Sequence, residues 1–271
     1  MVRVHRHFSE VAQQYKKLRT TDLELIFYIQ EQLQDLQRIY AADVGCGCGR
    51  YVTRLFQYLG DKLYLDCIDA NKEMLGQLQK SLQKYKIDNF RIRQTFAKNL
   101  PIQDESLDCI FTFNAIHHFS IFEFSNEVSR VLKDGGYFFI YTRLRSQNRT
   151  NIWGQYFPLF HQKETRLYEL DELKNIVEQI PKLEIQDIKL FNYERVSSLD
   201  RLVEQARNHH YSTFYLYSDD EFEESLNKFQ QNLKRHFKDL DAISWFDENV
   251  LFVVRKRTFE ITDIFKNVSF N

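Results

Sequence analysis

Residues 42–56 read ADVGCGCGRYVTRLF, and three of the eight glycines in the chain fall within five positions of this stretch. Glycine lets the backbone turn sharply and approach a bound molecule closely, so the cluster predicts a ligand held against the main chain. The preceding YAADV is typical of a buried strand, and apolar residues recur at helical spacing from Val52 until Gly60 ends the pattern. A strand, a glycine loop and a helix in this order begin a βαβ unit.

The same alternation of short apolar runs and helical patterns continues from Ile39 to Thr142, which is typical of a parallel sheet covered by helices. Ser120 and Glu123 have the spacing of a capping box, so a helix is expected to begin there. The further strands expected in this region are 63–69, 90–96, which alternates apolar and polar residues as an edge strand does, 109–113 and 137–142.

Beyond Arg143 longer helical patterns predominate, and they indicate insertions. One helix is expected over 170–180, ended by Pro181, and another over 222–237, behind a capping box formed by Ser218 and Glu221. Strand candidates at 183–191 and 249–257 are expected to pair and to extend the sheet. No internal repeat or low-complexity linker divides the chain, which favours one domain with helical insertions.

Composition and charge exclude several classes of protein. Lys and Arg number 37 against 38 Asp and Glu, so no overall field attracts nucleic acid or an anionic membrane, and the basic stretches at 2–7 and 255–257 are short. No apolar run approaches the roughly 20 residues that span a bilayer, and no secretory core segment follows the polar N-terminus. A cytoplasmic protein with no membrane partner and no nucleic-acid partner is expected.

The four cysteines, Cys46, Cys48, Cys67 and Cys109, lie in or beside the predicted strands. Their spacing is not that of a secreted disulfide framework. Cys46 and Cys48 are closer together than the usual zinc-binding pair, and no second pair follows. Buried, reduced thiols are therefore expected, and no metal site.

The glycine spacing distinguishes between nucleotide-type ligands. A dinucleotide loop has the pattern G-x-G-x-x-G, but its third glycine would fall at Arg50. Here the spacing is G-x-G-x-G, preceded by Asp43. This combination resembles motif I of the class I S-adenosylmethionine-dependent methyltransferases. The methionine end of that cofactor carries an ammonium group as well as a carboxylate, so an acidic residue beside the loop makes physical sense.

The resemblance continues in the right order over about half of the chain. Residues 97–119 are similar to the segment that passes the adenine, and 127–142 resemble the following helix, turn and fifth strand. Residues 8–19 are similar to an arm that closes over the cofactor in small-molecule methyltransferases. The resemblance implies an α/β, Rossmann-like fold with a seven-stranded, mostly parallel sheet, an antiparallel final hairpin and helical cap insertions. It also implies an N-terminal arm or lid (1–38), a cofactor-binding core (39–144) and insertions with the last two strands (145–271).

The resemblance also implies how the cofactor is held. Asp69 would accept hydrogen bonds from the ribose hydroxyls, although it could instead cap the next helix. Phe96 stands where many relatives have an acidic residue, so adenine recognition would rest on main-chain contacts and stacking. The residues expected to bind the cofactor are Tyr15, Arg19, Asp43, Gly45, Cys46, Gly47, Gly49, Asp69, Ala70, Met74, Phe96, Ala97, Asn114 and Ala115.

The reaction implied is methyl transfer, which releases S-adenosylhomocysteine and needs a base only if the acceptor must lose a proton. His117 and His118 are the candidates, His118 preferred, and one of them could instead pack or cap the adjacent helix. The Asn/Asp-Pro-Pro-aromatic signature is absent after the fourth strand. The aromatic stretches 151–157 and 209–217 could wall an acceptor pocket or simply pack the insertion helices.

Three functions stay open on the sequence. A small-molecule methyltransferase is preferred. An RNA or protein methyltransferase would need an open or basic groove beside the methyl site, and a non-catalytic module that only binds a ligand would have a blocked acceptor side. The sequence identifies neither the acceptor atom nor the oligomeric state.

Overall fold

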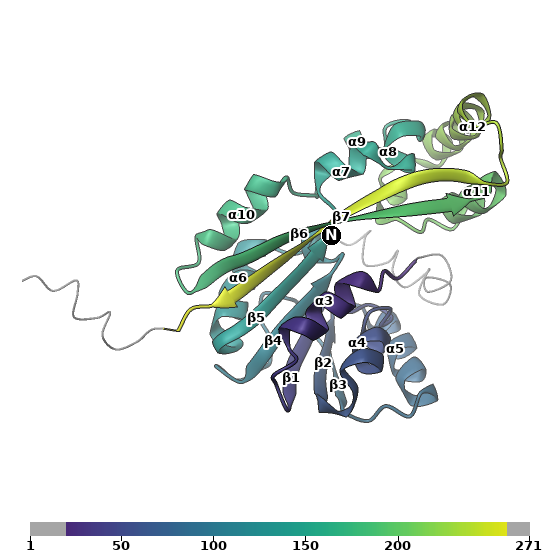
Figure 1. The fold of residues 1–271 in the computed structure, drawn as a ribbon. Coiled ribbons are helices and arrows are strands. Elements are labelled where there is room, and N and C mark those ends of the chain that lie inside the picture. The colour runs from purple at the N-terminus through teal and green to yellow at the C-terminus, as the bar shows by residue number, and fades with distance from the viewer. Residues whose placement is uncertain (1–19, 259–271) are drawn as a thin grey trace, which may run out of the picture.

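In the computed structural model, residues 20–258 are described, and they contain one seven-stranded sheet with the strand order β3-β2-β1-β4-β5-β7-β6 (Figure 1). Strand β7 is antiparallel to both of its neighbours, and the other adjacent pairs are parallel. The expected fold class is confirmed. The strands are β1 (Ile39–Val44), β2 (Leu63–Asp69), β3 (Phe90–Gln94), β4 (Leu107–Phe113), β5 (Leu132–Thr142), β6 (Leu183–Ser197) and β7 (Ile243–Lys256).

Helices cover both faces of the sheet, because successive residues of the central strands point to opposite sides. Phe111 of β4 belongs to the core that includes buried residues of α3 (Glu24–Gln32), α4 (Val52–Leu59) and α5 (Lys72–Lys84). Ile110 belongs to the opposite core, with buried residues of α6 (Ile121–Val131) and α10 (Leu170–Glu178). The glycine loop after β1 is thus supported by packed layers on either side of the sheet.

A third apolar core lies beyond the end of the sheet. Strands β6 and β7 stay paired from Leu183 opposite Lys256 to Ser197 opposite Ile243, so their far ends project past β5 (Figure 1). These ends and the small elements around them form what we call the cap. Its other elements are α7 (Arg145–Thr150), α8 (Ile152–Tyr156), α9 (Phe160–Lys163), α11 (Leu199–Arg207), η3 (Ser212–Leu216) and α12 (Asp219–His236), and its core is built mainly of aromatic residues.

The structure confirms most element positions and corrects several details. The helix at 52–59, the strand at 63–69 and the edge position of the strand from Phe90 were predicted correctly. Strands β6 and β7 are much longer than expected, because their outer halves pair with each other after leaving the sheet. Strand β5 begins at Leu132 rather than after the glycine pair. Ser120 does begin α6, but its side chain makes no capping hydrogen bond. The four cysteines are buried, as expected, and among the described residues none of them forms a disulfide bond.

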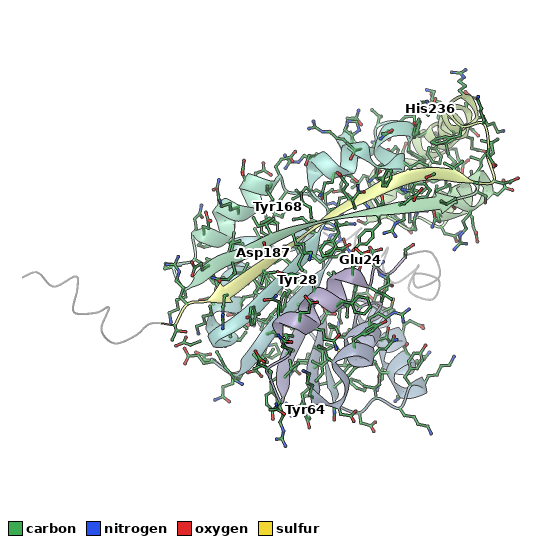
Figure 2. The ribbon with its side chains drawn as sticks, viewed as in Figure 1. Glu24, Tyr28, Tyr64, Tyr168, Asp187 and His236 are labelled. Carbon is green, nitrogen blue, oxygen red and sulfur yellow. The ribbon has the colours of Figure 1, made fainter. Side chains whose placement is uncertain are left out.

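Of the predicted N-terminal arm, the structure describes residues 20–38, which include α3. This helix packs into the core. Leu25, Ile26 and Ile29 are fully buried, and Tyr28 reaches the far edge of the sheet, where its hydroxyl donates to Asp187 Oδ2 of β6 at 2.6 Å (Figure 2). Tyr15 and Arg19 lie outside the described residues, as does the rest of the predicted arm or lid, residues 1–19. None of the helices within 20–258 is long and apolar enough to cross a membrane.

Candidate active site

One large cavity, of about 1080 Å³, opens at the carboxyl ends of the parallel strands and extends under the cap. Ligands of open α/β sheets bind at this edge. We call its lining residues between 43 and 123 the loop half, and those between 142 and 249, with Thr20 and Asp22, the cap half. The two halves therefore place the glycine loop and the insertion segments around the same space.

The glycine loop is shaped by close packing on one side and open space on the other. A Cβ on Gly45 would lie 2.5 Å from the Cβ of Ala115, and Gly45 has a φ of +78°, which L side chains rarely adopt. A Cβ on Gly47 would meet nothing within 4 Å. Gly47 lines the cavity, so its bare backbone faces room for a ligand. Gly49 has another purpose: a Cβ there would lie 2.1 Å from Leu78 Cδ1 of α5, and Gly49 does not line the cavity.

The carboxylate of Asp69 is held by two backbone donors. Its Oδ2 accepts from Gly47 N at 2.9 Å and its Oδ1 from Asn71 N at 2.8 Å. The capping residue of α5 is Asn71, whose Oδ1 accepts from Met74 N at 2.9 Å. Because Asn71 caps the helix, the capping alternative for Asp69 is not needed, and its carboxylate lines the cavity in a fixed orientation.

Asp43 is the buried acid of the loop half, with 1% of its surface exposed. Burial, followed by the negative charge of Asp69, raises the pKa of Asp43 well above its ordinary value. Its Oδ1 accepts no hydrogen bond from any of the residues 20–258. Because this buried acceptor lines the cavity and has no donor among the described residues, it favours a ligand that brings a hydrogen-bond donor or a positive charge.

The end of β4 supplies the opposite wall. Asn114 has a φ of +53°, uncommon for a residue other than glycine, and its N–H donates to Tyr141 O at 2.7 Å. Strained backbone of this kind is often found at functional sites. The short helix η2 (Ile116–His118) follows, and the rings of His117 and His118 lie 4.0 Å apart between centroids, both lining the cavity.

The structure brings most of the predicted site residues together, and Phe96 is the most exposed of them at 58%. Gly49 lies behind the loop, and Tyr15 and Arg19 are outside the described residues. The predicted residues that line the cavity are Asp43, Gly45, Cys46, Gly47, Asp69, Ala70, Met74, Phe96, Ala97, Asn114, Ala115, His117 and His118.

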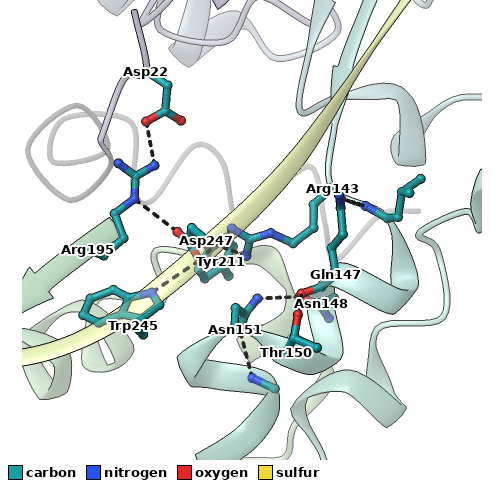
Figure 3. A network of polar contacts seen from close by, with 12 residues as sticks. Asp22, Arg143, Gln147, Asn148, Thr150, Asn151, Arg195, Tyr211, Trp245 and Asp247 are labelled. Carbon is teal, nitrogen blue, oxygen red and sulfur yellow. Dashed lines mark hydrogen bonds and ion pairs between the residues drawn. The ribbon is translucent and has the colours of Figure 1, made fainter. Parts of the chain in front are cut away.

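Sequence reasoning missed a network of charged residues in the cap half (Figure 3). Asp247 Oδ1 lies 3.1 Å from Arg143 Nη2 and accepts from Trp245 Nε1 at 3.4 Å, while its Oδ2 lies 3.5 Å from Arg195 Nε. Arg195 Nη2 also donates to Asp22 Oδ1 at 2.6 Å. Burial lowers the pKa of Arg143, but the charge of Asp247, together with Tyr211 and Tyr141, outweighs burial and raises that pKa above its ordinary value.

A second charged group lies nearby. Arg166 Nε donates to Glu164 Oε1 at 2.8 Å, and Thr213 Oγ1 donates to Glu164 Oε2 at 2.7 Å. Burial raises the pKa of Glu164, but the hydrogen bonds and charge of Arg166, together with the hydrogen bond from Thr213, outweigh burial and hold the pKa below the ordinary value. The aromatic stretches mostly pack the cap core, as one of the two interpretations held, but Trp153 and the turn 210–213 also line the cavity.

Comparison with known proteins agrees with this geometry. Residues 41–136 match a methyltransferase domain family. Over 99 residues the chain is 34% identical to the uncharacterized methyltransferase YcgJ of Bacillus subtilis, covering 36% of this chain and 38% of that protein. The crystal structure of YcgJ has the same fold, with a TM-score of 0.59 at 19% identity, covering 88% of this chain and all of that one. The chain thus contains, at residues 41–136, a methyltransferase domain of the class I S-adenosylmethionine-dependent type.

Two further methyltransferases are similar. A phthiotriol/phenolphthiotriol dimycocerosates methyltransferase of Mycobacterium ulcerans is 33% identical over 114 residues, covering 41% of this chain and 40% of that one. Phosphoethanolamine N-methyltransferase 2 of Haemonchus contortus, solved with phosphomonomethylethanolamine and S-adenosylhomocysteine, has a TM-score of 0.54 at 16% identity, covering 87% of this chain and 53% of that one. The chain spans less than half the length of the curated relatives it matches.

The cofactor of this methyltransferase family is S-adenosylmethionine, and the residues present fit it. The ammonium of its methionine end matches the buried Asp43 Oδ1, which lacks a donor among the described residues. Its ribose hydroxyls match Asp69, whose carboxylate lines the cavity and is oriented by two backbone donors. The open space in front of Gly47 leaves room for it.

Proposed function

We propose that the protein transfers the methyl group of S-adenosylmethionine to a small-molecule acceptor, with S-adenosylhomocysteine as the second product. The observation that carries this proposal is the continuity of the cavity from the glycine loop into the cap. Its volume of about 1080 Å³ is at the upper end of the roughly 300–1,000 Å³ of small-molecule sites. A cofactor in the loop half leaves the cap half for an acceptor.

The bound cofactor would supply an electrophilic methyl group, whose transfer leaves the carbon–sulfur electron pair on sulfur. The residues of the chain have the task of holding two reactants in line and excluding water. Asp69 would fix the ribose, Asp43 and Asn114 would hold the methionine end, and the cap would enclose the acceptor.

His118, or its neighbour His117, would take a proton from an acceptor that must lose one. Both line the loop half. General-base assistance is worth about 10²–10⁴-fold in rate. Once an acceptor is known, His118→Gln is expected to lower turnover by an amount in that range and to leave S-adenosylhomocysteine affinity unchanged.

Two rival functions receive less support. An RNA or protein methyltransferase would present an open or basic groove, whereas here residues of the cap line the acceptor side. A non-catalytic module would have this side blocked, whereas the cavity continues into it. The names of the similar M. ulcerans and H. contortus proteins also indicate acceptors other than nucleic acid or protein for those proteins.

The test is transfer of label from methyl-labelled S-adenosylmethionine to three separate substrates: a panel of small metabolites, total RNA and unfolded protein. Label in one or more small metabolites, with stoichiometric S-adenosylhomocysteine, is expected. Label only in RNA or protein would contradict the small-molecule proposal. Cofactor binding without any transfer, repeated across extracts, would favour the non-catalytic module.

A further inference from the structure

Three buried N–H groups in the cap half lack a hydrogen-bond acceptor among residues 20–258: Arg143 Nε, Asn148 Nδ2 and Arg166 Nη1. All three belong to residues that line the cavity, and all three are donors. An unsatisfied buried polar group costs about 1–3 kcal/mol. A ligand that brings acceptor oxygens to this wall would remove that cost.

The donor atom of Asn148 is fixed by its neighbours (Figure 3). Asn151 caps α8, and its Oδ1 accepts from Gly154 N at 2.8 Å, so its amide nitrogen must point the other way. That nitrogen donates to Asn148 Oδ1 at 3.2 Å. Because the oxygen of Asn148 faces Asn151, its Nδ2 is the atom left to meet a ligand.

The two arginines are tied to adjacent residues of one turn. Arg143 Nη1 donates to Tyr211 Oη at 3.2 Å, and Arg166 Nη2 donates to Ser212 Oγ at 3.0 Å. Both guanidinium groups therefore sit against the same stretch of the cap wall. Planar guanidinium groups are well suited to bind carboxylate or phosphate oxygens.

The charge of the cap half favours a single negative charge on the ligand. The described lining residues there carry three carboxylates that pair with arginines in the networks above, and a fourth arginine, Arg201, pairs with a carboxylate outside the lining. Because each of the four arginines faces a carboxylate, the wall carries little excess positive charge, which suits a monoanionic carboxylate better than a dianionic phosphate. The charged lining residues are Arg143, Arg166, Arg195 and Arg201 against Asp22, Glu164 and Asp247.

We propose that the methyl acceptor is a small organic acid whose carboxylate accepts hydrogen bonds from Arg143 Nε, Asn148 Nδ2 and Arg166 Nη1. This proposal rests on the proposed methyl transfer and names the chemical class of its acceptor. Trp153 and Trp245 line the same half of the cavity, so the remainder of the acceptor is expected to be apolar and to include a flat ring.

The test is calorimetric titration of the protein saturated with S-adenosylhomocysteine. The probes are benzoate, phenylacetate and indole-3-acetate, each with its primary amide, and phenyl phosphate. At least one acid is expected to bind tenfold or more tightly than both its amide and phenyl phosphate. Asn148→Asp keeps the shape and the Oδ1 acceptor but places a negative charge at the site, and it is expected to weaken acid binding at least tenfold.

A second variant and a matched control distinguish a loss of binding from misfolding. Arg166→Lys keeps the charge beside Glu164 but removes Nη1, and a tenfold loss is again expected. Arg145→Lys alters an arginine of α7 that pairs with Glu172 at 2.9 Å outside the cavity lining, and no change is expected. All three variants should bind S-adenosylhomocysteine as the parent does.

Other results would overturn the proposal. Equal binding of acids and amides would show that the site does not select a carboxylate. Preferred binding of phenyl phosphate would show that the site selects a dianion instead. Absence of acid binding to the S-adenosylhomocysteine complex would show that the cap half contains no anion site. Failure of the parent protein to bind S-adenosylhomocysteine would contradict the proposed function itself, so the two failures are distinguishable.

Discussion

Asp69 at the end of β2 accepts a hydrogen bond from the backbone N–H of Gly47 at 2.9 Å, and this bond joins the two segments that form the floor of the cavity. The other oxygen of the carboxylate accepts from Asn71 N. Because both donors are backbone groups, the carboxylate is oriented before any ligand binds, which lowers the cost of binding.

We expect Asp69→Ala to weaken S-adenosylhomocysteine binding by about 10- to 100-fold, since hydrogen bonds to a charged group contribute roughly 1.5–3 kcal/mol. Isothermal titration calorimetry measures this. Asp61→Ala, an exposed acid on the turn η1 (Gly60–Lys62) at the far end of β2, is the control and should leave the affinity unchanged. Unchanged affinity in Asp69→Ala would show that Asp69 does not bind the ribose hydroxyls.

Gly45→Ala should destabilise the fold by about 1–3 kcal/mol, because the new Cβ would collide with Ala115 and Phe119 and the backbone has a positive φ. Urea unfolding measures the change. Gly76→Ala is the matched control: Gly76 lies within α5, a Cβ added there would meet nothing within 4 Å, and a gain of about 0.5–1 kcal/mol is expected. Equal effects of the two substitutions would contradict the packing described for the loop.

Asp43→Asn should separate stability from binding. Burial and then the charge of Asp69 raise the pKa of Asp43, so the folded state holds the proton more tightly than the unfolded chain. The stability due to this proton is present at low pH and is lost as the pH rises above the ordinary value of about 3.9. The ligand-free variant should therefore have a higher melting temperature than the parent, by a margin that widens from pH 4 to pH 8.

The same variant should bind S-adenosylmethionine more weakly, because it lacks a carboxylate that can match the ammonium group. Asp88→Asn, an exposed acid before β3, should change neither property. A stability margin that narrows as the pH rises would show that Asp43 is not held in its protonated form in the folded protein.

Asp247→Ala should cost about 2–4 kcal/mol of unfolding free energy, because it leaves Arg143 and Arg195 largely buried without their shared carboxylate. Chemical unfolding again measures it. The exposed pair Arg207 and Glu223, 3.4 Å apart, is the reference, and Glu223→Gln should cost less than about 1 kcal/mol. A cost for Asp247→Ala as small as that of the exposed pair would show that the network does not hold the cap to the sheet.

The sequence predicted the loop half of the cavity well because its residues follow the short-range pattern of strand, loop and helix. Asp43 and Asp69 stand at or near the ends of adjacent parallel strands, and the sheet topology alone brings them to one edge. The length of β6 and β7 was underestimated because, past the sheet, these strands pair only with each other and their apolar pattern weakens.

The cap half was missed because its residues are far apart in the sequence. Asp22, Arg195 and Asp247 meet only when the segment before α3 packs together with β6 and β7. An arginine within a strand pattern is also typical of an exposed face, and only the tertiary structure shows that Arg195 is mostly enclosed. Arg143 directly after β5 was the one local hint, since it follows the carboxyl end of a parallel strand.

Calorimetric titration of the protein with S-adenosylmethionine and S-adenosylhomocysteine, with NAD as the control, shows directly whether the glycine loop holds the methyl donor. Micromolar binding of the two adenosyl compounds is expected, which corresponds to about 8 kcal/mol of binding free energy, and NAD is expected not to bind. Binding of neither adenosyl compound, or equal binding of NAD, would contradict the proposed methyl transfer.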